Sequence, residues 1–327
     1  MSTCKVCGAE LRPYKKHVFD DRYGYPKAFD ISRCTSCGLL ITLPPLTEAE
    51  IGPLYSDHYP YNDVDPKKIR AGFKPETDKD SRRSNWLKGN HKIHFMLPPG
   101  TGRVLDVGCG DGRSLLQLEA LGYEAHGIEA DENIRRIKDE LRLDIYIGTI
   151  EDYPSLPEKF DIIIANQLIE HIINLESFMN SAYKLLKPGG TIIMSTPNAG
   201  SIQRFMFGRA WVNWHIPYHQ QIFTKDSLRL LLEKFGFSVT ETRTVSPTAW
   251  TLHHLHAIRH PQKLGVKNPY WSGKPKEKTK DSTGESSKAL SLKPYIFKFI
   301  VACVTVFNRI LDVCGLGDCL IITATKQ

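Results

Sequence analysis

The chain has 327 residues, of which 41% are hydrophobic and 24% are charged, a globular balance that allows a sizeable buried core. Its formal net charge of +7 is concentrated in one place, because residues 261–294 hold eight lysines and only three acidic residues. This local excess argues against a protein whose whole surface coats nucleic acid.

The eight cysteines indicate a reducing environment. The sequence starts without an apolar leader segment, and in such a chain cysteines serve as free thiols or metal ligands rather than as disulfides. We therefore expect a cytoplasmic protein, with a peripheral position on the inner face of the membrane as an additional option.

Two matched Cys-x-x-Cys-Gly sequences open the chain, and their cysteines are Cys4, Cys7, Cys34 and Cys37. Each pair places two thiolates within reach of one ion, and four thiolates suit a structural, tetrahedral Zn²⁺. The 26 residues between the pairs exceed the usual spacing, so we expect a hairpin with an insert. We interpret residues 1–45 as a small zinc ribbon, with unligated cysteines and a redox pair as the alternatives.

Residues 46–99 are interpreted as a connector that ends in a helix. Tyr55, Tyr59 and Tyr61 lie in a Pro-rich stretch, where they either pack the connector onto the core or line an acceptor pocket. Apolar residues recur over 80–96 and predict a helix, which the prolines that follow it end before the sheet begins.

Residues 102–113 indicate a short apolar strand, a glycine-rich turn and the start of a helix. Gly108, Gly110 and Gly112 let the chain turn tightly and leave bare main chain for a ligand at the helix N-terminus. This order places the turn at the switch point of a doubly wound α/β sheet, where ligands bind. The spacing differs from the dinucleotide fingerprint, and Asp106 just before it suits a cationic ligand better than a pyrophosphate.

Further strands follow at the spacing of an α/β fold. A second strand ends at Glu129, whose carboxylate can accept hydrogen bonds from both hydroxyls of a ribose. A third strand is predicted over 144–149 and a fifth over 191–198. The fourth, over 160–166, is a continuous apolar run, as expected for a buried parallel sheet.

Together these phrases resemble the class I S-adenosylmethionine (SAM) methyltransferases. Five of the family's motifs occur in the correct order over roughly residues 100–245, among them FDIIIANQLIEHI and LKPGGTIIMSTPN. The branch that contains quinone-biosynthesis O-methyltransferases and many glycan-cluster enzymes is the most similar. The resemblance implies a Rossmann-like, seven-stranded α/β sheet with its last strand antiparallel, and SAM as the cofactor. The cofactor-binding residues that it implies are Asp106, Gly108, Gly110, Gly112, Glu129, Asp152, Asn166 and Gln167.

A stretch dense in aromatic residues and histidines, 211–224, follows the fifth strand and lies outside any regular period. Loops after strands are where such folds keep acceptor pockets. Methyl transfer to a hydroxyl requires a base, and histidine suits that role. His219 in this stretch and His171 after the fourth strand are the candidates, with His219 preferred. A loop histidine held by a backbone hydrogen bond is the alternative for each.

The paired cysteines and the Tyr-rich connector also resemble bacterial deoxysugar C-methyltransferases, in which a zinc module precedes the SAM domain. That family carries YHEHxxYFS-like residues where this chain has residues 218–224. The glutamate of that phrase is Gln220 here, and the family's long C-terminal domain has no counterpart. Both departures weaken the case for C-methylation.

The last quarter of the chain combines a basic and an apolar segment. Residues 261–294 predict a flexible loop, and residues 295–313 predict an apolar helix whose uncharged run is too short to span a bilayer. A final strand over 318–325 then closes the sheet. The helix packs over the sheet or against a second copy in a homodimer. Alternatively, residues 261–313 contact an anionic membrane and present a lipid-linked acceptor.

The sequence therefore predicts a zinc ribbon over 1–45, a connector over 46–99 and a SAM methyltransferase domain over 100–327 with an insertion at about 250–317. We expect methyl transfer to a small or lipid-linked acceptor, with a hydroxyl of a sugar, glycan or related metabolite favoured. One alternative is an RNA methyltransferase that binds RNA with its ribbon, although the ribbon's formal charge of only +3 argues against nucleic acid. The other is a non-catalytic SAM-binding protein, against which the intact acidic residues Asp106, Glu129 and Asp152 argue.

Overall fold

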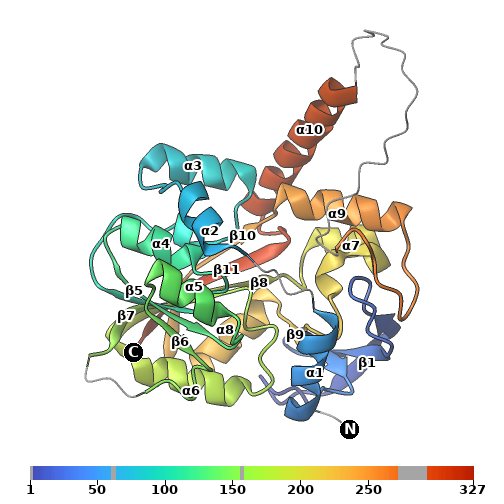
Figure 1. Ribbon diagram of the computed structural model, residues 1–327. Helices are drawn as coiled ribbons and strands as arrows, with labels where there is room; N and C mark the ends of the chain where they lie inside the picture. Colours follow the sequence, from blue (N-terminus) through green and yellow to red (C-terminus); the bar gives the residue numbers. More distant parts are fainter. Residues whose placement is uncertain (1–2, 60–63, 155–157, 272–292) are drawn as a thin grey trace.

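A seven-stranded mixed sheet forms the centre of the molecule, described by a computed structural model over residues 3–59, 64–154, 158–271 and 293–327 (Figure 1). Its strands, in spatial order, are β10 (Phe237–Val245), β11 (Cys319–Lys326), β8 (Leu186–Pro197), β7 (Phe160–Asn166), β4 (Arg103–Val107), β5 (Glu124–Glu129) and β6 (Ile145–Ile147). Strand β11 runs antiparallel to both of its neighbours, whereas the other neighbouring strands pair in parallel. The predicted Rossmann-like α/β sheet, with its last strand antiparallel, is confirmed.

Helices cover both faces of this sheet. Helices α4 (Arg113–Ala120) and α5 (Ile134–Leu141) pack on one face, and α6 (Leu175–Leu185) and α8 (Lys225–Lys234) pack on the other. Successive side chains of β7 enter opposite layers, Ile163 the α6–α8 layer and Ile164 the α4–α5 layer. Since both faces are buried, the centre of β7 is apolar at every position.

A second, four-stranded sheet joins the N-terminal segment to the main domain. Strands β1 (Leu11–Phe19) and β2 (Ala28–Cys34) form the expected hairpin between the cysteine pairs, and β3 (Leu40–Leu43) pairs with β2. The fourth strand, β9 (Gln221–Ile222), pairs with β3 but comes from the aromatic stretch after β8. The ribbon's sheet is therefore completed by residues that lie far away in the sequence.

The connector contains the helices α1 (Glu48–His58), α2 (Pro66–Gly72) and α3 (Lys79–Lys88) and the 3₁₀ turn η1 (Ile93–Phe95). The prediction of one helix over 80–96 is wrong beyond Lys88. Gly89 adopts a left-handed conformation with φ of 73°, and a Cβ at this position would lie 2.5 Å from the Ser246 carbonyl oxygen. Gly89 therefore ends α3 as its left-handed C-cap, and its N–H donates to the Trp86 carbonyl at 2.9 Å.

The aromatic stretch after β8 folds into short helical pieces. They are α7 (Ile202–Phe207), η2 (Gly208–Ala210) and η3 (Val212–Trp214). Trp211 and Trp214 are buried and pack edge to face with ring centroids 5.0 Å apart. These rings give the stretch an apolar core of its own beside the main sheet.

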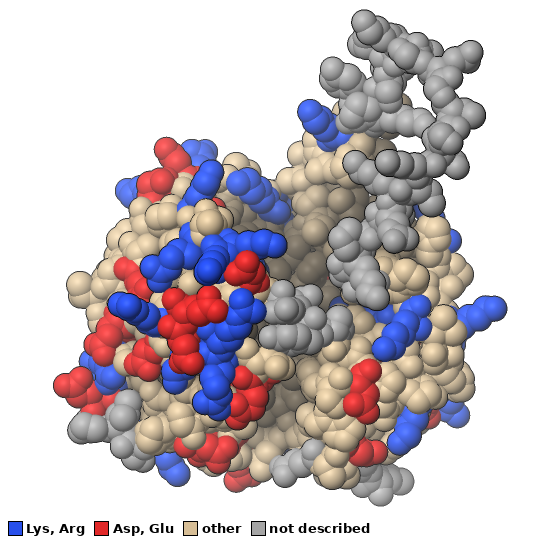
Figure 2. Space-filling view, in the orientation of Figure 1, with Lys and Arg blue, Asp and Glu red and all other residues tan. Residues whose placement is uncertain are grey.

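The segment between β10 and β11 holds α9 (Thr248–Arg259), which the sequence did not predict, and α10 (Lys293–Val313), which corresponds to the predicted apolar helix. Helix α10 projects from the body of the molecule (Figure 1), and Phe299 and Val313 on it are exposed. Its surface is mostly uncharged, whereas charges of both signs are mixed over the face formed by α3 to α5 (Figure 2). Most of the predicted flexible basic loop lies outside the described residues. Across the described ranges, every helix is too short or too polar to cross a membrane.

Candidate active site

The glycine-rich turn joins β4 to α4 at the carboxyl edge of the sheet. Gly108, Gly110 and Gly112 have φ values of 76°, 55° and 73°, in the left-handed region that favours glycine. A Cβ at Gly112 would lie 2.5 Å from a methyl carbon of Leu143, whereas one at Gly110 would meet open space. The turn therefore packs tightly against the core on one side and leaves main chain bare on the other, which fits a ligand that lies against the backbone.

Two acidic side chains lie beside this turn because their strands are parallel neighbours. Glu129, at the end of β5, accepts hydrogen bonds from the backbone N–H groups of Gly110 (2.8 Å) and Asp131 (3.1 Å). Asp106 in β4 is buried, and its Oδ1 has no hydrogen-bond partner. Burial, with a smaller contribution from the charge of Glu129, raises the pKa of Asp106 to about 7. A buried carboxylate oxygen without a partner, beside a second carboxylate, favours a ligand with positive charge.

The other predicted cofactor residues lie on either side of the turn. Asp152 is exposed after β6, where it accepts a hydrogen bond from Thr149 Oγ1 at 2.8 Å. Asn166 ends β7, and its Oδ1 accepts from Ser195 Oγ at 2.8 Å. Gln167 follows with a positive φ of 53°, and it lines the next cavity. The structure thus brings the three glycines, Asp106 and Glu129 into one cluster and places the remaining three at the neighbouring strand ends.

A cavity of about 270 Å³ opens beside Gln167. Its lining combines the end of β7 with the ribbon, the connector, the aromatic stretch and α9. The lining residues are Arg22, Tyr59, Gln167, Glu170, His171, Val212, Asn213, His215, His219, Trp250, His253 and Trp271. Both predicted bases therefore face the same space, and that space adjoins a predicted cofactor residue.

The two predicted bases are held by carbonyl groups. His219 Nδ1 lies 2.9 Å from the Asn213 carbonyl oxygen, and His171 Nδ1 lies 3.1 Å from that of Tyr218. Because a carbonyl only accepts, each ring carries its proton on Nδ1, which leaves Nε2 as the atom with a lone pair. Burial lowers the pKa of His171 to about 4 and that of His219 well below its usual range. Both imidazoles are therefore neutral near pH 7.

The connector tyrosines contact the core of the molecule and also lie at the cavity. Tyr55 OH lies 3.1 Å from His171 Nδ1, and Tyr59 lines the cavity. Their rings contact each other and the ring of Tyr218. Tyr61 lies outside the described residues. The described tyrosines both pack the connector onto the core and close one side of the cavity.

Sequence reasoning missed Glu170 and Arg22. Glu170 is fully buried and accepts a hydrogen bond from Thr196 Oγ1 at 2.9 Å, while burial raises its pKa to about 8. Its signal in the sequence was an acidic residue beside His171 at the end of an apolar strand. Arg22 reaches the cavity from the ribbon, and its guanidinium stacks on Trp271 at 4.4 Å from the ring centroid. Nothing local in the sequence connects Arg22 with this site.

The residues that carry His219 are fixed from two sides. On the ribbon side, Thr42 Oγ1 donates to the His219 carbonyl (2.7 Å) and the Thr42 N–H donates to that of Gln220 (3.0 Å). On the sheet side, the Gln220 N–H donates to the Glu170 carbonyl at 2.9 Å. The Gln221 side chain also donates to the carbonyl of Ile169 at 2.8 Å. The position of His219 relative to Glu170 therefore depends on the ribbon.

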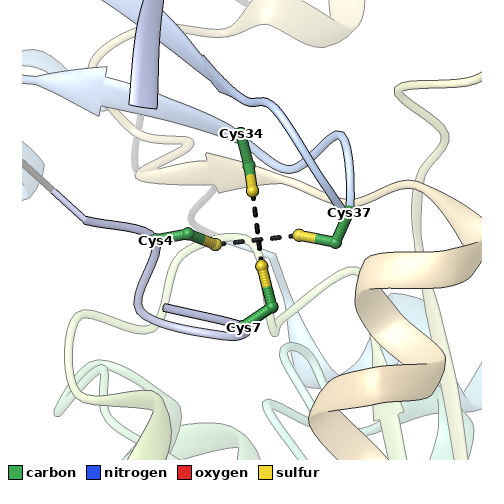
Figure 3. Close-up of side chains that lie close together, drawn as sticks. All are labelled: Cys4, Cys7, Cys34 and Cys37. Atoms are coloured by element: carbon green, nitrogen blue, oxygen red, sulfur yellow. Dashed lines mark hydrogen bonds between the residues drawn. The ribbon is translucent and has the colours of Figure 1, made fainter. Parts of the chain in front are cut away.

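The four predicted metal ligands converge on one point, as Figure 3 shows. Cys4 Sγ lies 3.7 Å from Cys37 Sγ, and Cys7 Sγ lies 3.4 Å from Cys34 Sγ. These separations exceed a disulfide bond and approach the ~3.8 Å that a tetrahedron with zinc–sulfur bonds of about 2.3 Å requires. The site fits Zn²⁺ with four protein ligands, which leaves no position for substrate.

Comparison with known proteins shows which proteins this chain is similar to. Residues 81–242 match the family model of a methyltransferase domain. A ubiquinone biosynthesis O-methyltransferase from Cereibacter sphaeroides is 27% identical over 163 residues, which cover 46% of this chain and 66% of the relative. One from Bartonella bacilliformis is 31% identical over 127 residues, 37% of this chain and 47% of the relative. The chain thus spans less than two thirds of each relative's length.

The solved structures that resemble this chain have lower sequence identity to it than the relatives named above. A SAM-dependent methyltransferase from Archaeoglobus fulgidus has 18% identity and a TM-score of 0.43, over 86% of this chain and 100% of that one. Phosphoethanolamine N-methyltransferase 2 from Haemonchus contortus, solved with SAM, has 17% identity and a TM-score of 0.47, over 88% and 62%. These values are too low to bear on the site.

Removing metal from the four cysteines is expected to release β9 as well as the ribbon. Structural zinc contributes on the order of 10 kcal/mol, so the ribbon strands should unfold and β9 should lose its partner β3. Hydrogen–deuterium exchange after chelation should therefore show faster exchange over residues 3–45 and 219–222, reversed by added Zn²⁺. Amides of β4 and β5 serve as the internal control, and unchanged exchange over 219–222 would contradict the coupling.

Proposed function

We propose that this chain, whose residues 81–242 match the model of a methyltransferase domain, is a class I SAM-dependent methyltransferase that methylates a hydroxyl group of a small acceptor. The observation that carries the proposal is the cavity of about 270 Å³ beside Gln167, into which two neutral imidazoles project. The relatives named above are O-methyltransferases by name, which supports oxygen as the receiving atom.

The glycine turn and the acidic residues around it would hold the cofactor. We assign the ribose hydroxyls to Glu129, the adenine amino group to Asp152, and the positively charged end to the region of Asp106. Bound SAM supplies an electrophilic methyl group, whose transfer to a hydroxyl oxygen leaves a neutral thioether and requires removal of the hydroxyl proton. The bare main chain at Gly110 lets the ligand approach the backbone.

His171 and His219 are proposed to activate the acceptor hydroxyl. Their rings lie 4.8 Å apart, and the carbonyls of Tyr218 and Asn213 hold each Nδ1. A hydroxyl in the cavity would meet Nε2 of either ring, which can receive its proton. The hydrogen bonds at Nδ1 fix the ring orientations, so the cavity is arranged before the acceptor enters.

A second cavity indicates that the acceptor is larger than its reacting group. This cavity measures about 370 Å³ and shares His253 and Trp271 with the first. Lys15 and Arg209 line it, with Asp21 as the acidic residue of the lining. We propose that it holds the remainder of a hydroxylated metabolite, sugar or glycan that carries negative charge.

The four cysteines are proposed to hold a structural Zn²⁺ that positions the acceptor side of the site. The ribbon contributes Arg22 to the first cavity and Lys15 to the second, and it fixes His219 through Thr42. A ribbon that forms part of the acceptor site supports a role in methyl transfer to a small molecule over a role in RNA binding.

SAM binding is expected to tighten about tenfold between pH 6 and pH 8, because Asp106 titrates near pH 7 and only its ionised form attracts a cation. Calorimetry at several pH values should show this rise, with no binding of NADH. Asp106→Asn should bind weakly, and its profile gives the baseline for titration of the ligand's own amine. Asp111→Asn is the matched control, because Asp111 lies in the same turn but pairs with Arg113. A flat profile for the wild-type protein would contradict the role of Asp106.

His219→Ala and His171→Ala are expected to lower kcat by roughly 10²-fold or more while SAM affinity stays within a few-fold of wild type. Transfer of a radiolabelled methyl group to nucleotide sugars, glycolipids and phenolic acceptors would measure this. Turnover within a few-fold of wild type in both variants would show that neither imidazole takes part. Methyl incorporation into RNA alone would favour the RNA methyltransferase, and SAM binding without any transfer would favour the non-catalytic alternative.

Helix α10 is proposed to contact an anionic membrane when the acceptor is lipid-linked. Exposed apolar side chains on it include Ile296, Phe299 and Val313. Flotation with phosphatidylglycerol vesicles at low salt should recover the protein, and Phe299→Glu should lower the bound fraction several-fold. Flotation of wild type no better than of this variant would remove the membrane from the proposal and leave a second copy of the chain as the partner, which its mass in solution would reveal.

A further inference from the structure

Glu170, His171 and His219 form a cluster that methyl transfer by a free base does not require. One ligand atom from each of these residues lies within 4.8 Å of the corresponding atom of the other two. Glu170 and His171 come from the turn after β7, and His219 immediately precedes Gln220 and β9. Two imidazoles and one carboxylate are a common ligand set for divalent ions of the first transition series.

The hydrogen bonds around this cluster leave one free ligand atom on each residue. Nδ1 of each imidazole is held by a carbonyl oxygen, so Nε2 is unprotonated and has no hydrogen-bond partner among the described residues. One carboxylate oxygen of Glu170 accepts from Thr196, while Oε1 is buried without a partner. Each ligand is thus oriented by a second hydrogen bond, which is the arrangement that surrounds bound metals in proteins.

Glu170 Oε1 is a buried acceptor atom that a bound cation would satisfy. Glu170 is fully buried, and leaving a buried acceptor unsatisfied is costly. Arg22 lines the same cavity, but its guanidinium is directed to the Val212 carbonyl and to the Trp271 ring. Among the described residues, Arg22 makes no ion pair with Glu170. A cation held by the Glu170 carboxyl group and the two imidazoles would give this oxygen a partner.

We propose that Glu170, His171 and His219 bind a divalent transition-metal ion that receives the acceptor's hydroxyl oxygen. Three protein ligands leave coordination positions open toward the cavity, in contrast to the four cysteines of the ribbon. Arg22 lines the same cavity, so its positive charge would attract an anionic acceptor to these open positions. This inference rests on the proposed methyl transfer and names the group that activates the hydroxyl.

The ion changes how the hydroxyl loses its proton. Coordination to a divalent ion lowers the pKa of an oxygen ligand. The O–H bond breaks, the proton leaves to solvent, and an oxygen lone pair forms the new bond to the methyl carbon. The electron pair of the broken carbon–sulfur bond stays on sulfur. The imidazoles then act as ligands, and this role replaces the proton-accepting role assigned to them above.

Cobalt(II) distinguishes this site from the ribbon by its spectrum. Zinc-replete protein should bind one equivalent of Co²⁺ with visible d–d bands and without the thiolate charge-transfer band that the four cysteines would produce. Glu170→Gln and His171→Ala should each weaken Co²⁺ binding by about 100-fold or more, and Thr196→Val by 10- to 100-fold. His253→Ala is the matched control, since His253 lines the same cavity outside the cluster, and it should bind Co²⁺ as wild type does.

Because Glu170 is buried and its variant could misfold, the half-buried His171 provides the second variant, and retained SAM binding verifies the fold of each. Absence of the Co²⁺ spectrum in wild-type protein that binds SAM would overturn the metal site. A spectrum unchanged in both ligand variants would overturn it as well. Neither result affects methyl transfer, which is measured separately. Conversely, a Co²⁺ site that both variants remove, in a protein without transferase activity, would support the site and reject the proposed function.

Discussion

The hydrogen bonds on both sides of residues 219–222 are the constraint on which the acceptor side of this molecule depends. On one side this short segment pairs with β3 of the ribbon, and on the other it contacts the turn that carries Glu170 and His171. The four-cysteine cluster fixes the ribbon strands, the ribbon fixes β9, and β9 fixes His219. The four-cysteine cluster and the cavity beside Gln167 are therefore parts of one mechanical unit, although the cysteines and His219 lie far apart in the sequence.

The cofactor side has a different origin. Parallel pairing of β4 with β5 brings the glycine turn and Glu129 to the same edge of the sheet, and the main-chain hydrogen bond from Gly110 to Glu129 links them. Asp106 lies in the buried part of β4, where water cannot stabilise its charge. This half of the site is built from local strand–turn–helix geometry and does not depend on the ribbon.

That difference explains how far the sequence could predict the structure. The glycine turn, Glu129 and the paired cysteines are recognisable because their chemistry lies in short, contiguous motifs. These motifs predict a doubly wound α/β sheet, and the resemblance to class I methyltransferases implies its seven strands. Arg22, the pairing of β9 with β3 and the free oxygen of Glu170 arise from contacts between distant segments, for which a single sequence has no signal. The prediction of where α3 ends is wrong for a different reason, because Gly89 is itself a local signal: a left-handed glycine typically ends a helix.

The position of α9 has a consequence for how such a protein diversifies. This helix brings His253 to both cavities, yet it lies in a segment that enters after β10 and returns at β11. The two strands pair with each other whatever connects them, so the connection can be exchanged as a unit without altering the strands that carry the glycine turn. In the proposed function, the acceptor contacts that this connection supplies are thereby separate from the strands that carry the glycine turn, so the connection is a part of the chain in which acceptor specificity would change.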